Sequence, residues 1–508
     1  MNPARSTPAS ELDLSTPDGR AAVGGRVAAP GYDRSRLRTG IVHFGVGGFH
    51  RAHQAMYLDR LLGDESGRAA ASEWGICGVD VLPADRPKKQ ALTAQHSLYT
   101  LVLKAPDGST EPRVIGSLTG YLFAPDEPGR VLEVLTDPRT RIVSLTITEG
   151  GYNVSHVTGE FDAANPAVAA DLVPDAVPRT VFGFIVEALR RRRAAGTPPF
   201  TVMSCDNIPG NGDMARRMFA AFASLRDPAF GAWLQAEVAF PNSMVDRITP
   251  VTTAADIEQL RAEHGIRDAL PVVCEPFTQW VLQDTFPGGR PPWERCGVQL
   301  VADVTPYELM KLRLLNVGHQ ALAYAGYLAG YRYAHDAAAD PVFAAFLRSY
   351  MQAEGRPTLP EVPGTDLDAY ITTLLERFAN PAIRDTLARL AAFSSDRIPN
   401  WLVPVIRHNI AAGGQVARSA AIVASWARYA EGTDEQGQPI DVVDQRRDAV
   451  LARAAAQRQD PLAFVRDEQL FGDLAGQPAF TGPYLAARES FRRHGARATY
   501  QQLSQGAP

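Results

Sequence analysis

The chain has 508 residues, of which 45% are hydrophobic and 21% are charged, and its formal net charge is −5 at pH 7. This is the balance of a folded globular protein, and the length favours two large domains. A mildly acidic chain without a long Lys/Arg run gives no electrostatic surface for nucleic acid or an anionic membrane, and the run Arg190–Arg193 fits a solvated C-terminal helical turn.

Residues 1–35 are rich in Pro, Gly, Ser, Ala and charge, and they are predicted to form a flexible N-terminal lead-in. The first residues lack the apolar core of a secretory signal, and no apolar run in the chain approaches the roughly 18 residues of a membrane span. The four cysteines are scattered without a CxxC pair, which favours reduced thiols over disulfides or a thiolate zinc site. A cytoplasmic protein without a membrane partner is expected.

Residues 36–302 are predicted to form an α/β domain. Short apolar runs predict strands at 41–44, 74–82, 97–104, 142–148 and 200–205. Helical patterns fall among them at 49–62, 181–192 and 213–225. Strands that alternate with helices favour a largely parallel sheet covered on both faces.

Residues 303–508 are predicted to form a second, mainly α-helical domain. Alanine- and leucine-rich segments at helical spacing are found at 306–330, 341–353, 366–378, 381–393, 415–430 and 442–456. No strand signal of comparable strength occurs there, so the domain boundary is expected near Asp303.

The first predicted strand runs into a glycine-rich segment, GVGGFHRAH, and then into a helix. A strand that feeds a GxG turn and a helix N-terminus is how α/β proteins hold a dinucleotide pyrophosphate. The residues expected to line the cofactor are Gly45, Val46, Gly47, Gly48 and Phe49. The third glycine of GxGxxG is missing, so a simple tight turn is the alternative. His50 and His53 lack further ligands at metal spacing, and no metal is expected.

An acidic residue at the end of the second strand is expected to bind the ribose hydroxyls of NAD. Asp85 follows that strand and is better placed than Asp80, which lies inside it. Arg86 next to it leaves some tolerance of NADP open, but NAD is favoured. Glu149 ends another predicted strand, where open sheets bind ligands.

A polar face on the helix predicted at 306–330 carries the strongest chemical signal. The residues that share this face, within an arc of about 140°, are Glu308, Lys311, Asn316 and His319. Burial would lower the affinity of Lys311 for its proton and let it act as a base, while Asn316 could donate to a developing alkoxide. His319 could position a hydroxyl group. The alternative is a solvated stripe with Lys311 exposed.

Other polar residues follow predicted strands. Asp206 and Asn207 come directly after the strand at 200–205, and Asp246 and Arg247 lie in the segment FPNSMVDRITP. For each of these residues alone, a turn cap or a surface salt bridge is the simpler interpretation.

Five motifs together resemble the polyol-specific long-chain dehydrogenase/reductase family: GVGGFHRAHQ, SLTITEGGY, FTVMSCDN, FPNSMVDRITP and the Lys-x4-Asn-x2-His helix. They occur in the family's order, and the resemblance runs from about Val27 to near the C-terminus. It implies a Rossmann-type NAD-binding domain, a helical substrate domain and an active site in the cleft between them. It also implies reversible oxidation of a polyol secondary alcohol to a ketose, with D-mannitol giving D-fructose.

The resemblance implies a role for each candidate residue. Lys311 would be the general acid/base, and Asn207 and Asn316 would hold the substrate oxygen at the reacting carbon. His319 and Asp246 would bind and orient the substrate.

Further family positions surround this centre. Glu308 would guide proton exchange with solvent, and Asp85 would contact the NAD ribose. Arg389 and Arg397 would reach polyol hydroxyls from the helical domain. Ala84 stands where close relatives carry a glutamate, so rejection of NADP could be weaker, and Arg397 replaces a lysine.

Other functions stay open on the sequence alone. A sugar-acid reductase of fructuronate type would use Arg389 and Arg397 for a carboxylate, and D-arabinitol or D-sorbitol could replace mannitol. Val317–Gly318 replaces a Gly–Ser pair of the family, which bears on substrate positioning. A non-catalytic NAD-binding regulator is the alternative from a different class. The resemblance favours a monomer.

Overall fold

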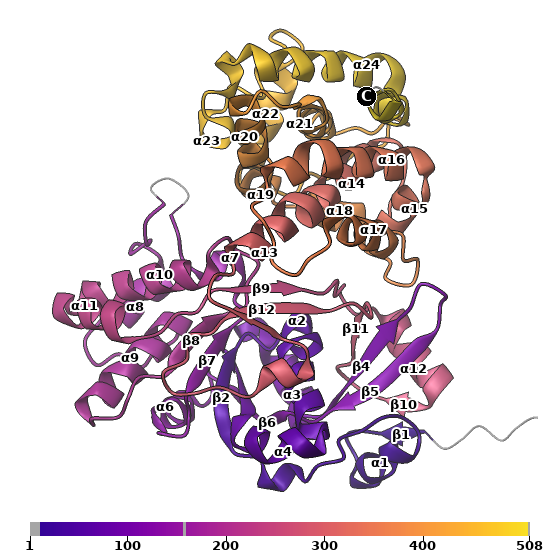
Figure 1. Cartoon of the computed structure of the whole chain (residues 1–508). Helices are drawn as coiled ribbons and strands as arrows, with labels where there is room; N and C mark the ends of the chain where they lie inside the picture. Colours follow the sequence, from indigo (N-terminus) through magenta and orange to yellow (C-terminus); the bar gives the residue numbers. More distant parts are fainter. Residues whose placement is uncertain (1–10, 156–158, 506–508) are drawn as a thin grey trace, which may run out of the picture. The chain divides into compact units, whose positions relative to one another are not determined.

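The computed structural model describes residues 11–155 and 159–505 of the chain (Figure 1). They belong to two compact units. The first comprises Met1–Ala105 and Ser109–Val304, and the second comprises Pro106–Gly108 and Thr305–Pro508.

A five-stranded sheet forms the centre of the first unit, with strand order β6-β3-β2-β7-β8. Its strands are β2 (Thr39–Phe44), β3 (Gly75–Asp80), β6 (Leu118–Phe123), β7 (Ile142–Leu145) and β8 (Thr201–Ser204). Every neighbouring pair runs parallel. Strands β3, β7 and β8 are buried along their whole length, as expected where helices cover both faces. The predicted α/β class is confirmed.

Helices cover both faces of this sheet (Figure 1). The first-unit helices are α1 (Pro17–Ala22), α2 (Gly48–Ala52), α3 (Gln54–Gly63), α4 (Glu65–Ala71), α5 (Arg86–Ala94), α6 (Pro128–Thr136), α7 (Thr148–Gly151), α8 (Pro166–Asp171), α9 (Val181–Ala194), α10 (Asn211–Arg226), α11 (Pro228–Glu237) and α12 (Ala254–His264). Because side chains alternate along a strand, Val42 and Phe44 of β2 pack with α6, α9 and α10, while Ile41 packs with α3.

Two three-stranded sheets also belong to the first unit. One has the order β11-β4-β5 and is built from β4 (Tyr99–Lys104), β5 (Thr110–Ile115) and β11 (Val272–Cys274). The other has the order β13-β12-β9 and is built from β9 (Ser243–Asp246), β12 (Gln279–Gln283) and β13 (Gln299–Val301). The predicted strand at 97–104 thus belongs to a separate sheet, antiparallel to β5.

The N-terminal segment differs from its prediction. Strand β1 (Leu12–Asp13) pairs with β10 (Ile266–Arg267), and Leu14 and Val23 are buried in a small core of their own. Tyr32 donates a hydrogen bond to Asp59 at 2.6 Å. The expectation of a flexible lead-in is therefore wrong for residues 11–35, because apolar side chains among the small and charged residues provide a packing face. Residues 1–10 lie outside the described part.

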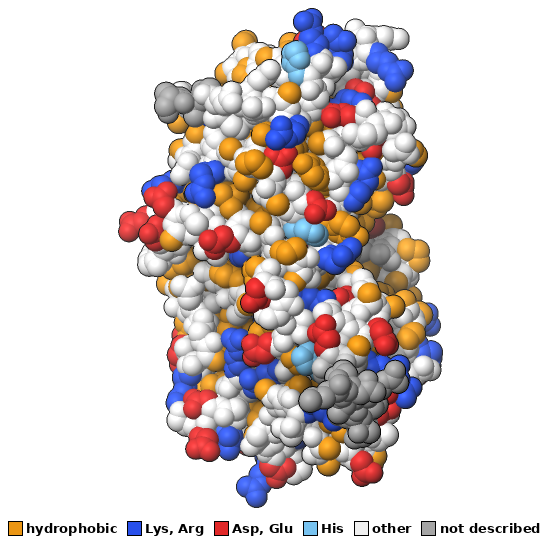
Figure 2. Space-filling view, turned by 90° about the vertical axis from the view of Figure 1, so that its right-hand side faces the viewer, with side chains coloured by type: hydrophobic (Ala, Val, Ile, Leu, Met, Phe, Trp, Pro, Cys, Tyr) orange, Lys and Arg blue, Asp and Glu red, His pale blue; other side chains and the backbone are white. Residues whose placement is uncertain are grey.

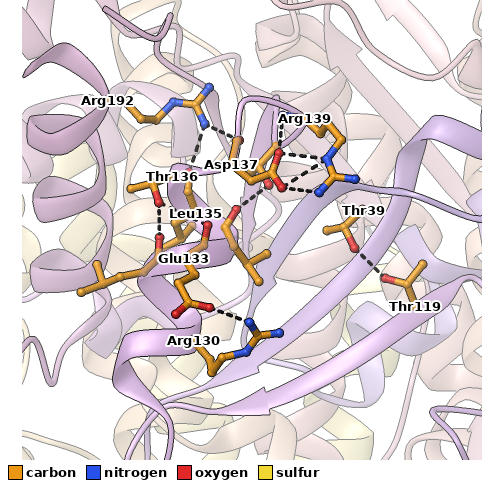
Figure 3. A network of polar contacts seen from close by, with 12 residues as sticks. Thr39, Thr119, Arg130, Glu133, Leu135, Thr136, Asp137, Arg139 and Arg192 are labelled. Carbon is orange, nitrogen blue, oxygen red and sulfur yellow. Dashed lines mark hydrogen bonds and ion pairs between the residues drawn. The ribbon is translucent and has the colours of Figure 1, made fainter. Parts of the chain in front are cut away.

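A polar network closes the turn between α6 and β7 (Figure 3). Arg139 binds the Asp137 carboxylate through its Nε at 3.0 Å. Arg192 donates from Nη1 to the carbonyl of Asp137 at 2.8 Å and to that of Leu135 at 3.0 Å. The expectation of a solvated Arg190–Arg193 run is thus wrong for Arg192, which is buried. This network lies where β7 begins, at the opposite edge to the carboxyl ends that bind ligands.

The second unit is helical, and its described residues show only isolated bridges instead of strands. Its α-helices are α13 (Thr305–Met310), α14 (Val317–Leu328), α15 (Ala334–Ala339), α16 (Pro341–Tyr350), α17 (Leu367–Phe378), α18 (Leu387–Ala391), α19 (Ser394–Trp401), α20 (Val403–Ala411), α21 (Ala417–Tyr429), α22 (Arg447–Ala456), α23 (Glu468–Phe471) and α24 (Pro478–Gln505). Two π-helices, Lys311–Asn316 and Met351–Gly355, interrupt this series. The helix predicted at 381–393 is confined to α18, and Phe393 beyond it has a left-handed φ of 57°.

All four cysteines are free thiols. Burial raises the pKa of Cys77, Cys274 and Cys296 to about 12, and it also raises the pKa of Cys205. Cys296 is the half-buried one, and its Sγ lies 3.1 Å from the carbonyl oxygen of Trp293.

The face in Figure 2 carries Lys/Arg and Asp/Glu side chains interspersed with one another. None of the described helices is long and apolar enough to cross a membrane.

Candidate functional site

The glycine loop leaves β2 at its carboxyl end. Gly45 has a φ of +92°, and a Cβ there would lie 2.0 Å from the carbonyl oxygen of Thr146, so only glycine fits. At Gly47 the nearest atom to a Cβ would be 3.8 Å away, and φ is −83°. The side of Gly47 on which a Cβ would stand is therefore open, as the close approach of a pyrophosphate requires, while its N–H donates to the Gly45 carbonyl at 2.6 Å.

Asp80 and Asp85 have different environments. Asp80 is buried and accepts hydrogen bonds from the backbone N–H of Val46 at 3.0 Å and from the Tyr121 hydroxyl at 2.7 Å. The ammonium of Lys88 lies 2.7 Å from Asp80 and 3.0 Å from Asp85. Burial raises the pKa of Asp80, against the effect of Lys88. Asp80 thus holds the glycine loop, while Asp85 lies beyond the strand and is less buried.

A layer of buried polar side chains lies behind the glycine loop. His43 contacts Ser144 Oγ through Nδ1 at 2.8 Å and the Gly45 carbonyl through Nε2 at 3.1 Å. Its ring stacks on His50 with the centroids 3.4 Å apart. Burial lowers the pKa of His43 to about 3 and that of His50 well below its usual range, so both rings are neutral. Within the described residues no group of three or more His, Cys, Asp or Glu could hold a metal.

Asp206 organises the carboxyl ends of β7 and β8. It accepts hydrogen bonds from the backbone N–H of Ile147 at 3.1 Å and of Thr148 at 2.8 Å, and from the Tyr152 hydroxyl at 2.8 Å. Thr148 has a left-handed φ of 63°, which these bonds hold in place. Burial raises the pKa of Asp206 to about 6. The next residue is Asn207.

The hydrogen bonds of Asp206 bring two predicted site residues to the same edge of the central sheet. The turn held by Asp206 carries Glu149 on α7, and Asn207 follows Asp206 directly. Both Glu149 and Asn207 are exposed. Two predicted site residues from separate strands are thus brought to the same edge of the sheet, the edge at which α/β proteins bind ligands.

Asp246 lies in a strand and not in a loop. It is the last residue of β9, is 3% exposed, and pairs in register with Gln279 of β12. Arg247 is also buried and donates hydrogen bonds to the carbonyls of Ala52 at 2.7 Å and Glu275 at 3.0 Å. Arg247, which follows β9, therefore links α2 to the segment just after β11.

The helix predicted at 306–330 is not a uniform α-helix, although the predicted polar face was derived from α-helical geometry. Residues Lys311–Asn316 form a π-helix between α13 and α14. In an α-helix, residues five apart point about 140° away from each other. A π-turn bonds each N–H to the carbonyl five residues earlier, and this wider turn moves Asn316 towards the face of Lys311.

Burial distinguishes these side chains from a solvated stripe. Lys311 is 8% exposed and Asn316 is 4% exposed. The amide nitrogen of Asn316 has no hydrogen-bond partner among the described residues. A buried N–H left unpaired costs about 1–3 kcal/mol, so an oxygen of a ligand at this place would offset that cost.

The flanking members of the helix are less buried. Glu308 and His319 are both half-buried. The His319 ring packs on Phe378 of α17, with the centroids 4.4 Å apart.

The two predicted polyol-binding arginines already have partners within the second unit. Arg389 forms a paired contact with Asp385, with Nε at 2.6 Å from Oδ1. Arg397 donates from Nη1 to the carbonyl of Leu390 at 2.8 Å. Gln320 of α14 donates to the same carbonyl at 3.0 Å, so Arg397 is held beside the helix that carries His319.

Comparison with known proteins decides the family. Residues 39–295 match the Rossmann domain of mannitol dehydrogenases, and residues 303–490 match their C-terminal domain. The chain belongs to the mannitol dehydrogenase family. The predicted resemblance and the Rossmann-type fold with a helical second domain are thereby confirmed.

Mannitol dehydrogenases of fungi are similar over nearly the whole chain. The mannitol 2-dehydrogenase of Phaeosphaeria nodorum is 46% identical over 482 residues, which cover 94% of this chain and 84% of the relative. That of Aspergillus fumigatus is 45% identical and covers 94% of this chain and 96% of its own length.

Solved structures give the same result. A ternary complex of Pseudomonas fluorescens mannitol 2-dehydrogenase with NAD and D-mannitol has a TM-score of 0.89 at 44% identity, covering 98% of this chain and 100% of that one. A D-sorbitol dehydrogenase in substrate-free form has a TM-score of 0.84 at 39% identity, covering 94% and 98%.

Three functional features of this mannitol dehydrogenase family member were not predicted. Asp206 was identified only as a polar residue after a strand, and its burial is not visible in the sequence. Asp80 was rejected as a ribose ligand, but its role in holding Val46 was not foreseen. Lys88 pairs with both Asp80 and Asp85; its i,i+3 spacing from Asp85 could have been noticed, but its contact with Asp80, eight residues earlier at the end of β3, could not.

Proposed function

We propose that this chain is an NAD-dependent polyol dehydrogenase that reversibly oxidises the C2 alcohol of D-mannitol to D-fructose. The observation that carries the proposal is the π-helix Lys311–Asn316, which buries the Lys311 amine together with an amide nitrogen that has no hydrogen-bond partner in the described part of the chain. The family membership and the likeness to an enzyme solved with NAD and D-mannitol support the substrate and the cofactor.

The glycine loop fits NAD. The open side of Gly47 supports a close approach of the pyrophosphate, and we assign Asp85, which follows β3, to the ribose hydroxyls. Arg86, which could have bound the extra phosphate of NADP, is occupied by a double contact with Asp126 at 2.8 and 3.0 Å. NAD is therefore preferred over NADP. When bound, NAD supplies the acceptor for the hydride from C2.

The chain's own residues handle the proton and the developing charge. Neutral Lys311 accepts the proton of the C2 hydroxyl, and in the reverse direction its ammonium returns it. Asn316 donates from its free amide to the same oxygen, with Asn207 as a second donor. Glu308, which is half-buried, passes the proton on to solvent.

Remaining residues orient the polyol. We assign His319 and Asp246 to substrate hydroxyls, and Arg389 and Arg397 to the far end of the polyol. Because Arg389 is paired with Asp385, it presents little free positive charge. This favours a neutral polyol over a sugar acid of fructuronate type.

The test is initial-rate NADH formation from D-mannitol and NAD by wild type and by Lys311→Ala. Lys89→Ala, which removes a half-buried lysine paired with Asp126 and Glu127 in the first unit, is the matched control. We expect turnover by wild type and by the control, and a loss of at least about 10³-fold in the Lys311 variant, because proton transfer then lacks its base.

Two outcomes would contradict the proposal. Equal turnover by Lys311→Ala would remove the lysine mechanism, and binding of NAD without turnover on any polyol would favour a non-catalytic regulator.

D-Sorbitol is the second candidate substrate, because a D-sorbitol dehydrogenase has the same fold with a TM-score of 0.84. Comparing kcat/KM for D-mannitol, D-sorbitol and D-arabinitol ranks the three. We also propose that the protein works in the cytoplasm as a monomer, and light scattering in solution tests its oligomeric state.

A further inference from the structure

A second π-helix lies against the lysine-bearing one. Met351–Gly355 continues α16, and a Cβ on Gly355 would lie 2.7 Å from Cδ2 of Leu314 and 3.4 Å from the carbonyl oxygen of Arg313. Leu314 is fully buried. Glycine at 355 therefore permits the close approach of the two π-helices.

A tyrosine hydroxyl joins the two segments. Tyr350 is fully buried and donates a hydrogen bond at 3.0 Å to the carbonyl of Arg313, in the middle of the lysine-bearing π-helix. Burial raises the pKa of Tyr350 well above its usual range, so its hydroxyl stays a donor at any working pH. The Arg313 side chain donates in turn to the carbonyl of Thr358, just beyond the second π-helix.

The second π-helix is itself anchored by a buried carboxylate. Glu354 is fully buried and accepts hydrogen bonds from the backbone N–H of Arg418 at 2.8 Å and of Ser419 at 2.7 Å, and from the Ser419 hydroxyl at 2.5 Å. Asn409 donates to the Glu354 carbonyl at 2.9 Å. A buried carboxylate is costly unless fully bonded; here its bonds tie the segment to α21, and the bond from Asn409 to the Glu354 backbone carbonyl ties it to α20.

We propose that the π-helix Met351–Gly355 is a built-in support for the catalytic π-helix, and that Tyr350 is a positioning residue for Lys311 through the Arg313 carbonyl. The proposal rests on the proposed function, in which Lys311 is the base.

The physical reason is the alternative geometry of the lysine segment. If the turn around Arg313 relaxed to a regular α-helix, Lys311 and Asn316 would diverge by about 140° and could no longer meet one substrate oxygen. A donor on the Arg313 carbonyl and close packing on Leu314 both favour the wider turn. The support thus keeps the proton acceptor and the amide donor convergent.

Tyr350→Phe is the decisive variant, because it removes only the hydroxyl. The matched control is Tyr500→Phe: Tyr500 is also fully buried and donates at 2.9 Å to a carbonyl of the same helical stretch, that of Ala321 in the α-helical part. Both variants lose one buried hydrogen bond, so a similar fall in Tm is expected from each.

We expect kcat of Tyr350→Phe to fall about 10-fold or more, with KM for D-mannitol changed less than about twofold. The acid limb of its kcat–pH profile should move to higher pH, because a loosened turn admits water to Lys311. Tyr500→Phe should keep the wild-type kcat and profile. The proposal is overturned if the two variants behave alike, or if Tyr350→Phe keeps the wild-type profile.

Hydrogen exchange provides a readout that does not depend on the reaction. Amides of residues 311–318 should exchange faster in Tyr350→Phe than in Tyr500→Phe, and unchanged exchange there also overturns the proposal. Should wild type turn over no polyol, the proposed function fails, while this measurement still decides whether Tyr350 supports the π-helix. If Tyr350→Phe does not fold, hydrogen exchange of residues 311–318 is measured in Gly355→Ala instead, in which the added Cβ crowds Leu314.

Discussion

Asn316 is buried with its amide nitrogen unpartnered among the described residues, an arrangement that costs folding free energy. Replacing it by alanine removes both the unpaired group and the proposed donor to the substrate oxygen. We expect Asn316→Ala to lower kcat about 10²–10³-fold, as loss of one such donor does elsewhere, while Tm stays the same or rises. Stopped-flow turnover and thermal unfolding measure the two effects. A large fall in Tm would show that the amide has a structural partner instead.

Asp206 links stability to pH. Its pKa in the folded protein is raised by burial to about 6, from 3.8, so the folded state holds this proton more tightly than the unfolded state. Its contribution to the free energy of unfolding is therefore greatest below pH about 4 and is lost as pH rises through about 6, by at most about 3 kcal/mol. Urea unfolding of wild type and Asp206→Asn between pH 4 and 7 measures the difference. Parallel pH profiles for the two proteins would contradict this assignment.

At the scale of elements, two glycines of the same loop are expected to have different roles, Gly45 in stability and Gly47 in cofactor binding. Gly45→Ala forces a Cβ against the Thr146 carbonyl at a φ of +92°, so a clear loss of stability is expected. Gly47→Ala meets nothing closer than 3.8 Å and should keep the wild-type Tm. If the pyrophosphate lies over Gly47, its added methyl group should weaken NAD binding about 10-fold or more, measurable by titration calorimetry. Unchanged NAD affinity in Gly47→Ala would place the cofactor elsewhere.

The sequence predicts those strands that are marked by a continuous run of apolar residues. Four predicted strands became β2, β3, β7 and β8 because buried parallel strands are continuous apolar runs. Strands β9, β12 and β13 were missed, since each is short and begins or ends with polar residues.

The π-helix at Lys311 could not be read from periodicity. A helical repeat of 3.6 residues sets Asn316 about 140° from Lys311, whereas the π-helix that contains both brings them closer to one face. The wider turn depends on Tyr350 and Gly355, about 40 residues further along the chain. The roles of the site residues themselves remain predictions that the variants above test.

For the whole molecule, ligand binding should protect the two units in sequence. NAD alone should slow hydrogen exchange in the first unit, around residues 44–49, because the cofactor is proposed to bind there. D-Mannitol added with NAD should then slow exchange around 311–319 in the second unit. Hydrogen exchange with mass spectrometry of the full chain follows both. Protection of 311–319 by NAD alone, with no further change on adding mannitol, would argue against the proposed order of contacts.

The thiols give this protein a practical property. All four cysteines are free, three are buried, and burial raises the pKa of each well above neutral pH. Thiolate is the form that reacts with maleimides and oxidants, so the native protein should be almost inert to both. A pair of cysteines introduced at exposed positions, one in each unit, could therefore be labelled with fluorophores in the otherwise wild-type chain. Energy transfer between the dyes would then measure the distance between the two labelled positions with and without NAD and D-mannitol.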